Sequence, residues 1–147
     1  LREQAEAWLA PMGLRFKPSK TRITHTLHEH EGGAGFDFLG FTVRQFPVGK
    51  YRTPTYRGRP GYRTLIQPAK AAQKRHMRHL GEVVHKHRGT SQAALIAELT
   101  PIIRGWSNYY RTCAAKKTFG RLDHDLFHQL CRWAVWRHPG QCWTRRY

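Results

Sequence analysis

Cations at regular spacing are the first feature of this sequence that could bind a partner. Lys70, Lys74 and Arg78 recur at every fourth position of a segment with helical periodicity, so they share one face of the helix. Like charges at this spacing repel one another, and an anion lying along the row relieves the repulsion. The row therefore indicates either a site for an anion or a face that water solvates.

Tyrosine and arginine alternate in residues 45–62, a segment rich in proline and glycine that we expect to be a loop. The pairs are Tyr51-Arg52, Tyr56-Arg57 and Tyr62-Arg63. Arginine can contact phosphates while tyrosine stacks on bases, a combination that suits nucleic acid. A solvated loop of a basic protein would have a similar composition, so both interpretations stay open.

Histidine spacing gives only weak support for metal binding. His124 and His128 are four residues apart and His76 and His79 are three apart, which puts each pair on one helical face. No third ligand or cysteine cluster supports either pair, so we predict no metal site. Near pH 6 these side chains would add positive charge instead.

The charge balance predicts a polyanionic partner. The 147 residues include 26 lysines and arginines against 9 acidic residues, a formal net charge of +17. Residues 1–62 hold 10 basic and 5 acidic side chains, a net of +5, and residues 63–147 hold 16 and 4, a net of +12. No apolar run approaches the roughly 18 residues of a membrane span. We therefore expect nucleic acid rather than a membrane, bound mainly by the second half.

Cysteine usage predicts a reducing compartment, so we expect a cytoplasmic location. Cys113, Cys131 and Cys142 are odd in number and lack CxxC spacing, which argues against a disulfide framework or a zinc knuckle. We interpret all three as thiols in the core.

The first elements predicted are a helix and a short strand region. Residues 1–12 place apolar side chains on one helical stripe, and Gly13 follows at the position of a cap. We expect this helix to pack on a sheet. Residues 14–27 should contain one strand or two short ones on either side of a turn near Pro18.

Residues 36–44 are rich in aromatic and β-branched side chains, the composition of a strand. Gly40 in their middle permits a bulge or a close approach of another group to the backbone. A second strand of a hairpin could follow.

The second half predicts a small bundle of helices. Its first helix starts at Pro68, which suits the first turn, and ends at Gly89. Thr90 or Ser91 then caps the second helix.

Two further helices complete the predicted bundle of four. Thr100-Pro101 indicates an N-cap followed by proline in the first turn, which restarts the chain as a third helix at a new angle. Thr118 should cap the fourth helix, and Pro139-Gly140 should stop it.

Three ordered segments resemble the group II intron reverse transcriptase/maturase family, over nearly the whole chain. The family's sixth polymerase block is similar to Gly13-Leu14, Lys20-Thr21 and Ile23-Thr24-His25, and its seventh, the primer-grip hairpin, to Phe38-Leu39-Gly40-Phe41. The maturase signature is similar to Leu95-Ile96, Leu99-Thr100-Pro101-Ile102-Ile103-Arg104-Gly105-Trp106-Ser107-Asn108-Tyr109-Tyr110-Arg111, Phe119, Leu122-Asp123, Arg132-Trp133-Ala134, Arg137-His138-Pro139 and Trp143.

The resemblance implies an α+β chain. Residues 1–62 would be the C-terminal part of a reverse transcriptase palm with a primer-grip-like hairpin, and residues 63–147 a mainly α-helical thumb/maturase-specific domain. Such a protein would bind intron RNA and support its folding and splicing. The alternative is the primer-grip and thumb portion of an active RNA-directed DNA polymerase, which would also bind primer-template and need a missing N-terminal segment. A decayed remnant with non-specific affinity is a third interpretation.

The chain departs from the intact polymerase at the catalytic carboxylates. No Tyr-Ala-Asp-Asp motif or equivalent pair precedes Gly13, although polymerisation needs carboxylates to hold two metal ions. Asp37 adjoins the hairpin, and Asp123 and Asp125 point to different sides of a helix. We expect no polymerase activity from the chain alone and no cofactor in it, with Mg²⁺ required by the intact polymerase and the intron ribozyme. Lys20 matches a family lysine near the nucleotide site of the intact enzyme.

The candidate RNA contacts combine the cation row with polar positions of the signature. Trp106 and Tyr110 share an inward face and are interpreted as core, although the division of these aromatic residues between core and RNA stays open. The RNA-binding candidates are Arg52, Arg57, Arg63, Lys70, Lys74, Arg78, Arg104, Asn108, Tyr109, Arg111, Lys116, Lys117, Arg132 and Arg137, and the primer-grip-like residues are Phe38, Leu39, Gly40 and Phe41.

Overall fold

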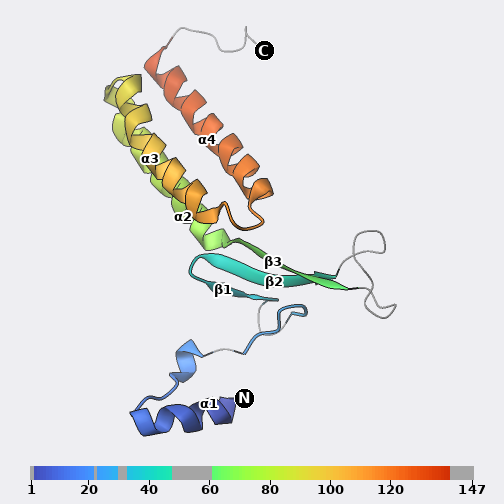
Figure 1. Ribbon diagram of the computed structural model, residues 1–147. Coiled ribbons are helices and arrows are strands. Elements are labelled where there is room, and N and C mark those ends of the chain that lie inside the picture. The colour runs from blue at the N-terminus through green and yellow to red at the C-terminus, as the bar shows by residue number, and fades with distance from the viewer. Residues whose placement is uncertain (1, 22, 30–32, 48–60, 140–147) are drawn as a thin grey trace.

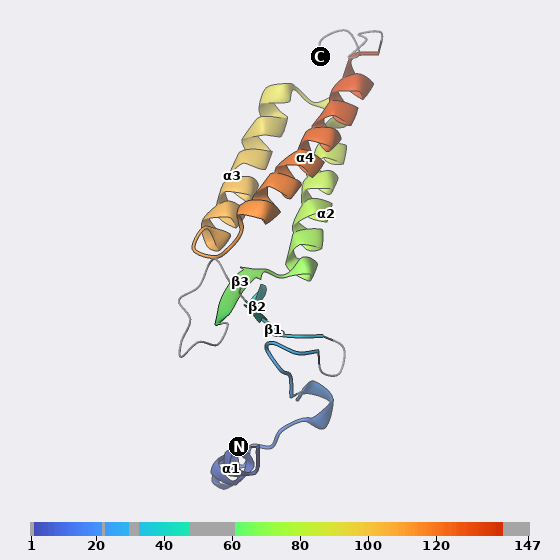
Figure 2. The same ribbon diagram turned by 90° about the vertical axis from the view of Figure 1, so that its right-hand side faces the viewer.

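The protein is arranged as a helix, a sheet and a helical bundle that follow one another along its length. The structure, a computed structural model, describes residues 2–21, 23–29, 33–47 and 61–139. Figure 1 shows the sheet at one end of the bundle and the N-terminal helix beyond the sheet, and a view at 90° shows the same order (Figure 2). The predicted α+β class with a helical second half is confirmed.

The N-terminal helix forms as predicted but does not pack on the sheet. Helix α1 covers Arg2–Leu9, the 3-10 turn η1 follows at Ala10–Met12, and Gly13 ends it with a φ of 70°. Trp8 and Met12 of the expected apolar stripe are 70% and 50% exposed. The helix lies beyond the sheet, whose end contacts the bundle (Figure 1), so the predicted packing is wrong.

The strand expected within residues 14–27 is not formed by the described residues. Pro18 instead opens a 3-10 turn, η2 (Pro18–Lys20). Proline suits this position because its φ is already that of a helical turn and it has no N–H to leave unpaired. Further on, the His25 carbonyl accepts a hydrogen bond from the Gly35 N–H at 2.8 Å, so the backbone runs beside the sheet without becoming a strand.

Three antiparallel strands form the sheet, in the order β1-β2-β3. Their bounds are Phe36–Phe38 for β1, Phe41–Pro47 for β2 and Tyr62–Pro68 for β3. The single strand predicted over residues 36–44 is therefore divided into a hairpin. Leu39 and Gly40 turn the chain with φ values of 47° and 80°. Two consecutive positive φ values are the geometry of a type I′ turn, which matches the twist of the flanking strands.

The loop predicted over residues 45–62 is shorter than expected. Its first three residues belong to β2 and its last to β3, because the two strands pair along their whole length. The predicted domain boundary after residue 62 therefore falls inside β3. Residues 48–60, which include Arg52 and Arg57, lie outside the described residues.

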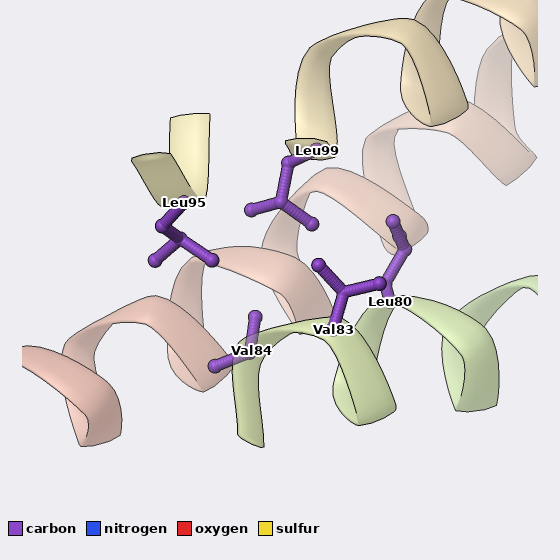
Figure 3. Packing of buried hydrophobic residues seen from close by; sticks show 5 residues of the cluster. All are labelled: Leu80, Val83, Val84, Leu95 and Leu99. Atoms are coloured by element: carbon purple, nitrogen blue, oxygen red, sulfur yellow. The ribbon is translucent and has the colours of Figure 1, made fainter. Parts of the chain in front are cut away.

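The bundle consists of long helices joined at a compact corner. Their bounds are Lys70–Lys86 for α2, His87–Gly89 for the 3-10 turn η3, Gln92–Tyr110 for α3 and Lys116–Arg137 for α4. Helices α2 and α4 both start at the sheet end, and α3 runs in the opposite direction (Figures 1 and 2). The core consists of Leu80, Val83 and Val84 from α2 and Leu95 and Leu99 from α3 (Figure 3).

Two of the three long helices in the described part of the chain start at other residues than predicted, and one starts as predicted. Pro68 ends β3 rather than opening α2. Helix α4 starts at Lys116, before the predicted cap Thr118. The buried Ala115 precedes it, and the Ala115 carbonyl accepts a hydrogen bond from the Phe119 N–H at 2.8 Å. Ser91 caps α3 as predicted, accepting a hydrogen bond from a backbone N–H of the first turn at 3.3 Å.

Helix α3 continues through Thr100-Pro101, so the predicted restart is wrong and the described bundle has three long helices. Proline inside a helix costs about 3 kcal/mol. Leu95, Leu99 and Ile103 lie on both sides of the proline and pack into the same core. Burying such side chains stabilises by roughly 1.5–3 kcal/mol each, which offsets the lost hydrogen bond and keeps the helix continuous.

One buried histidine holds the corner between α2 and α3. The Nδ1 atom of His87 lies 3.0 Å from the Val83 carbonyl, and its Nε2 lies 3.2 Å from the Glu98 carboxylate. The His87 carbonyl accepts a hydrogen bond from Trp133 Nε1 at 3.0 Å. Since these partners come from α2, α3 and α4, His87 fixes the relative position of all three helices.

Two tyrosine hydroxyls attach the hairpin turn to the end of α3. Tyr109 donates to the Leu39 carbonyl at 2.9 Å and Tyr110 donates to the Gly40 carbonyl at 3.1 Å. We call these four residues the hairpin clamp. Phe41 packs against both tyrosine rings, with centroid distances of 5.1 and 4.9 Å. The close approach predicted at Gly40 is confirmed, because a Cβ there would lie 2.7 Å from the Tyr110 hydroxyl.

Gly40→Ala should destabilise the protein by about 1–3 kcal/mol, because the added Cβ is strained at a positive φ and meets Tyr110. Urea unfolding followed by circular dichroism measures this loss. Gly105→Ala is the matched control, since nothing lies within 4 Å of a Cβ added there in α3. It should stabilise the helix by about 0.5–1 kcal/mol. A Gly40→Ala variant as stable as the wild type would contradict the clamp.

Candidate nucleic-acid interface

The predicted cation row lies on the solvent side of α2. Lys70, Lys74 and Arg78 are all exposed, whereas Leu80 and Val84 on the other side of the helix are buried. Among the described residues, none of the three cations forms an ion pair. The row thus presents unneutralised positive charge, the arrangement that attracts a polyanion.

A second polar row lies on α3. Arg104, Asn108 and Arg111 are exposed at spacings of four and three residues, which places them along one face of the helix. Tyr109 beside them is 51% exposed, but its hydroxyl belongs to the hairpin clamp. About half of the Tyr109 surface therefore remains accessible to a partner.

The candidates on α4 are spread along the helix. Lys116 and Lys117 open it at the sheet end, while Arg132 lies roughly 22 Å further along the axis at 1.5 Å per residue. Arg137 is also at the far end, where its Nη1 donates to the Arg88 carbonyl at 3.5 Å. The structure therefore brings the first two cations near the start of α2 and leaves Arg132 and Arg137 apart from them.

Four of the predicted cations lie before the bundle: three RNA-binding candidates and Lys20, the predicted neighbour of the nucleotide site. Arg63 is exposed on β3, opposite Phe46 of β2. Lys20 ends η2, and its side chain is outside the described residues, as are Arg52 and Arg57.

Phe38, Leu39, Gly40 and Phe41 form the turn of the hairpin, and their role as a primer grip stays a prediction. Phe38 and Leu39 are 63% and 70% exposed, so the tip of the hairpin presents an apolar surface. Phe41 is half-buried beneath Tyr109 and Tyr110. The turn is thus held rigidly from one side and open on the other.

An aromatic cluster confirms that Trp106 and Tyr110 belong to the framework. The two rings lie 4.4 Å apart, and the ring of His76 stacks on Trp106 at 4.7 Å with an interplanar angle of 11°. Phe119 contacts Trp106 edge-on at 5.7 Å. Burial lowers the pKa of His76 below its ordinary value, and the nearby His79 lowers it further.

The histidine pairs have different surroundings. His76 faces Trp106 and is 9% exposed, whereas His79 is exposed. His124 and His128 face one another on the surface of α4, with 3.0 Å between their Nε2 atoms. No three His, Cys, Asp or Glu side chains of the described residues come together as metal ligands. The absence of a metal site stays a prediction.

Two further cations, Arg44 and Arg121, converge with Lys70 on a cavity between the sheet and the bundle. Neither arginine has a distinctive spacing in the sequence. Arg44 shares one face of β2 with Thr42, but only the docking of the sheet on the bundle brings it near a residue of α4. The alternation of side chains along β2 is the sequence signal that places Arg44 on one face of the strand. It does not show that this face meets α4.

A comparison with family models decides the family. The model described as group II intron, maturase-specific domain matches residues 73–147, half of the chain. The chain belongs to the group II intron maturase family. No curated protein matches it in a sequence comparison. No described helix of this maturase is both long and apolar enough to span a membrane.

The maturase-specific match begins within α2 and includes both tyrosines of the hairpin clamp. Leu39 and Gly40, to which those tyrosines donate, precede the match. The clamp therefore connects the maturase-specific segment to the sheet before it, and places the hairpin turn at a fixed position beside α3.

The stability of this maturase should depend on the protonation of His76. Because the pKa of His76 is lowered in the folded state, the unfolded chain binds more protons in the window between the two pKa values. This contribution to stability is present above about pH 6.5, the ordinary histidine value. It is lost as the pH falls from there through the lowered folded-state pKa.

His76→Phe keeps a stacking ring that does not titrate, so its melting temperature should fall less than that of the wild type between about pH 7.5 and about 5.5. Scanning calorimetry at both pH values measures the difference. His79→Gln, a change at an exposed position, should keep most of the wild-type pH dependence. The same pH dependence in the His76→Phe variant and the wild type would contradict this role.

Proposed function

We propose that this maturase chain binds intron RNA and supports its folding and splicing. The observation that carries the proposal is the maturase-specific match over the same helices that expose the unneutralised cations. The cation row on α2 and the polar row on α3 are the surfaces offered to RNA. Ribozyme chemistry stays in the RNA, and the protein contributes contacts that favour one fold of it.

The mechanism we propose is electrostatic and geometric. Lys70, Lys74 and Arg78 displace counterions from the phosphate backbone, which supplies affinity without sequence information. Arg104 and Asn108 have planar polar groups that can form directed hydrogen bonds to RNA. Affinity and selectivity would thus arise on different helices.

Binding should weaken steeply with salt. If roughly 6 to 10 phosphates are contacted, affinity should fall on the order of a thousandfold or more between about 50 and about 200 mM salt. Fluorescence anisotropy with a labelled intron RNA measures the slope. Binding that does not respond to salt would overturn the electrostatic mechanism.

Arg104→Lys separates selective from non-selective binding, because it keeps the charge but loses the forked guanidinium. Affinity for the cognate intron should fall by roughly 1–3 kcal/mol, while affinity for unrelated RNA of equal length should hardly change. Lys74→Gln is the control, and it should weaken both RNAs alike and make the salt dependence shallower.

Equal losses on both RNAs for Arg104→Lys, with an unchanged melting temperature, would leave only the interpretation of a remnant with non-specific affinity. A lowered melting temperature would instead assign Arg104 a structural role.

A second candidate function is the primer-grip and thumb part of an RNA-directed DNA polymerase. The observation that favours it is the apolar surface before the bundle, where Trp8, Ile23, Phe38 and Leu39 are 63% to 70% exposed. A polymerase segment that supplies the palm would cover these side chains.

A primer-extension assay with Mg²⁺ tests this candidate. The chain alone should extend no primer on an RNA template, because it lacks the carboxylate pair that holds the metal ions. Addition of a polymerase segment with that pair should restore extension if the second candidate is correct. Incorporation by the pure chain would refute the expectation that it is inactive alone.

A further inference from the structure

A polar cavity lies where the sheet meets the bundle. Its volume is about 400 Å³, and it is lined from three directions. The lining includes Asp37 and Arg44 from the sheet, Lys70 and Gln73 from α2, and Thr118 and Arg121 from α4. Three cations thus face one carboxylate across a space large enough for a phosphate group and part of its sugars.

The donors of this cavity are arranged for an anion that the described residues do not supply. Arg44 Nε is buried and has no hydrogen-bond partner among the described residues. Its guanidinium is held over the ring of Phe46, 5.1 Å from the centroid. A buried guanidinium N–H without an acceptor is unfavourable. Because Nε itself is covered, a ligand oxygen would be bound by the part of the Arg44 guanidinium that lines the cavity.

Arg121 is oriented from the other side. It donates to Gln73 Oε1, while Gln73 Nε2 donates to the Pro68 carbonyl at 2.6 Å. The amide thus fixes one edge of the guanidinium and leaves its other N–H groups available. Lys70 is exposed beside it and forms no ion pair within the described residues.

Asp37 is the one acidic group that the described residues contribute to the lining. It accepts a hydrogen bond from the Thr42 hydroxyl at 2.5 Å. It forms no salt bridge with Arg44, Lys70 or Arg121 among the described residues. The carboxylate therefore reduces the positive potential of the cavity without removing it.

The helix directions add to this potential. Both α2 and α4 start at the sheet end (Figure 1). Lys70 and Thr118, from the first turns of these helices, line the cavity. Neither N-cap residue forms a side-chain hydrogen bond, and neither first turn contains an acidic residue. The helix dipoles thus direct positive potential to the same place as the cations.

A neighbouring hollow of about 270 Å³ continues from the cavity toward the cation row. It shares Lys70, Gln73 and Arg121 with the cavity and extends to Lys74. A polymer whose phosphate occupies the cavity would therefore have its next phosphate near the row on α2.

We propose that this cavity binds one phosphate group of an RNA backbone, with Arg44, Lys70 and Arg121 as its donors. The proposal rests on the RNA-binding function proposed above and adds the point at which the backbone is anchored. Tetrahedral phosphate oxygens accept hydrogen bonds from several directions, which suits donors that converge from a sheet and two helices.

The first test uses inorganic phosphate, which needs no RNA. The melting temperature of the full chain is compared in phosphate and in chloride at equal ionic strength. Phosphate should stabilise the wild type, and the stabilisation should be clearly smaller in Arg44→Gln, which keeps only the general effect of an anion excluded from the protein surface. The stabilisation should increase in Asp37→Asn, which removes the opposing charge, and persist in Arg132→Gln, the control at an exposed cation far from the cavity. Equal stabilisation of the wild type and Arg44→Gln would overturn the site.

The second test uses RNA binding. Arg44→Gln and Lys70→Gln should each weaken binding about tenfold and reduce the salt slope by about one. The double variant should lose less than the product of the two losses, because both cations contact the same phosphate. Arg44→Gln combined with Arg132→Gln should show the full product. A full product for Arg44→Gln with Lys70→Gln would contradict a shared phosphate.

The two proposals fail in distinguishable ways. If the wild type binds RNA and both cavity variants bind it equally well, the cavity proposal is refuted and the proposed function stands. If phosphate stabilises the wild type through Arg44 but no RNA binds, the proposed function is refuted and the anion site stands. A loss of RNA binding in Lys70→Gln cannot be attributed to misfolding. Lys70 is exposed, and its side chain makes no hydrogen bond among the described residues.

Discussion

The apolar contact between α2 and α3 is the interaction on which the rest of the structure depends. Leu80 and Leu95 are each 2% exposed, and the surrounding side chains of this small core come from the same two helices and from α4. In a chain with a net charge of +17, every cation must stay outside such a core. Because one face of α2 is buried in this core, Lys70, Lys74 and Arg78 on the other face lie in the solvent.

Periodicity in the sequence was sufficient to predict the helical second half, because burial of Leu80 and Val84 leaves an unmistakable spacing. Local capping chemistry also predicted Gly13 and Ser91 correctly. Pro101 was misjudged because the penalty for proline is local, whereas the packing that offsets it involves residues on both sides and on other helices. Propensities of single residues do not predict a helix limit where contacts with other helices contribute more free energy than the local penalty.

The candidate site was predictable only where it lies along one helix. The row on α2 follows from spacing alone, and its exposure agrees with that expectation. The cavity at the sheet does not, because Arg44 and Arg121 meet only after strands and helices have docked. Arg44 and Arg121 are far apart in the sequence. The periodicity of β2 does not indicate contact with α4, and that of α4 does not indicate contact with β2.

The hairpin clamp also has a consequence for the order in which the chain can assemble. Its hydrogen bonds join residues that are 70 positions apart. On a ribosome, Leu39 and Gly40 emerge well before Tyr109 and Tyr110, so the hairpin can pair its own strands but has no place to dock. The sheet must wait until α3 has been synthesised to its last turn. Docking then closes a long loop, a slow step that comes after the local contacts of hairpin and helices.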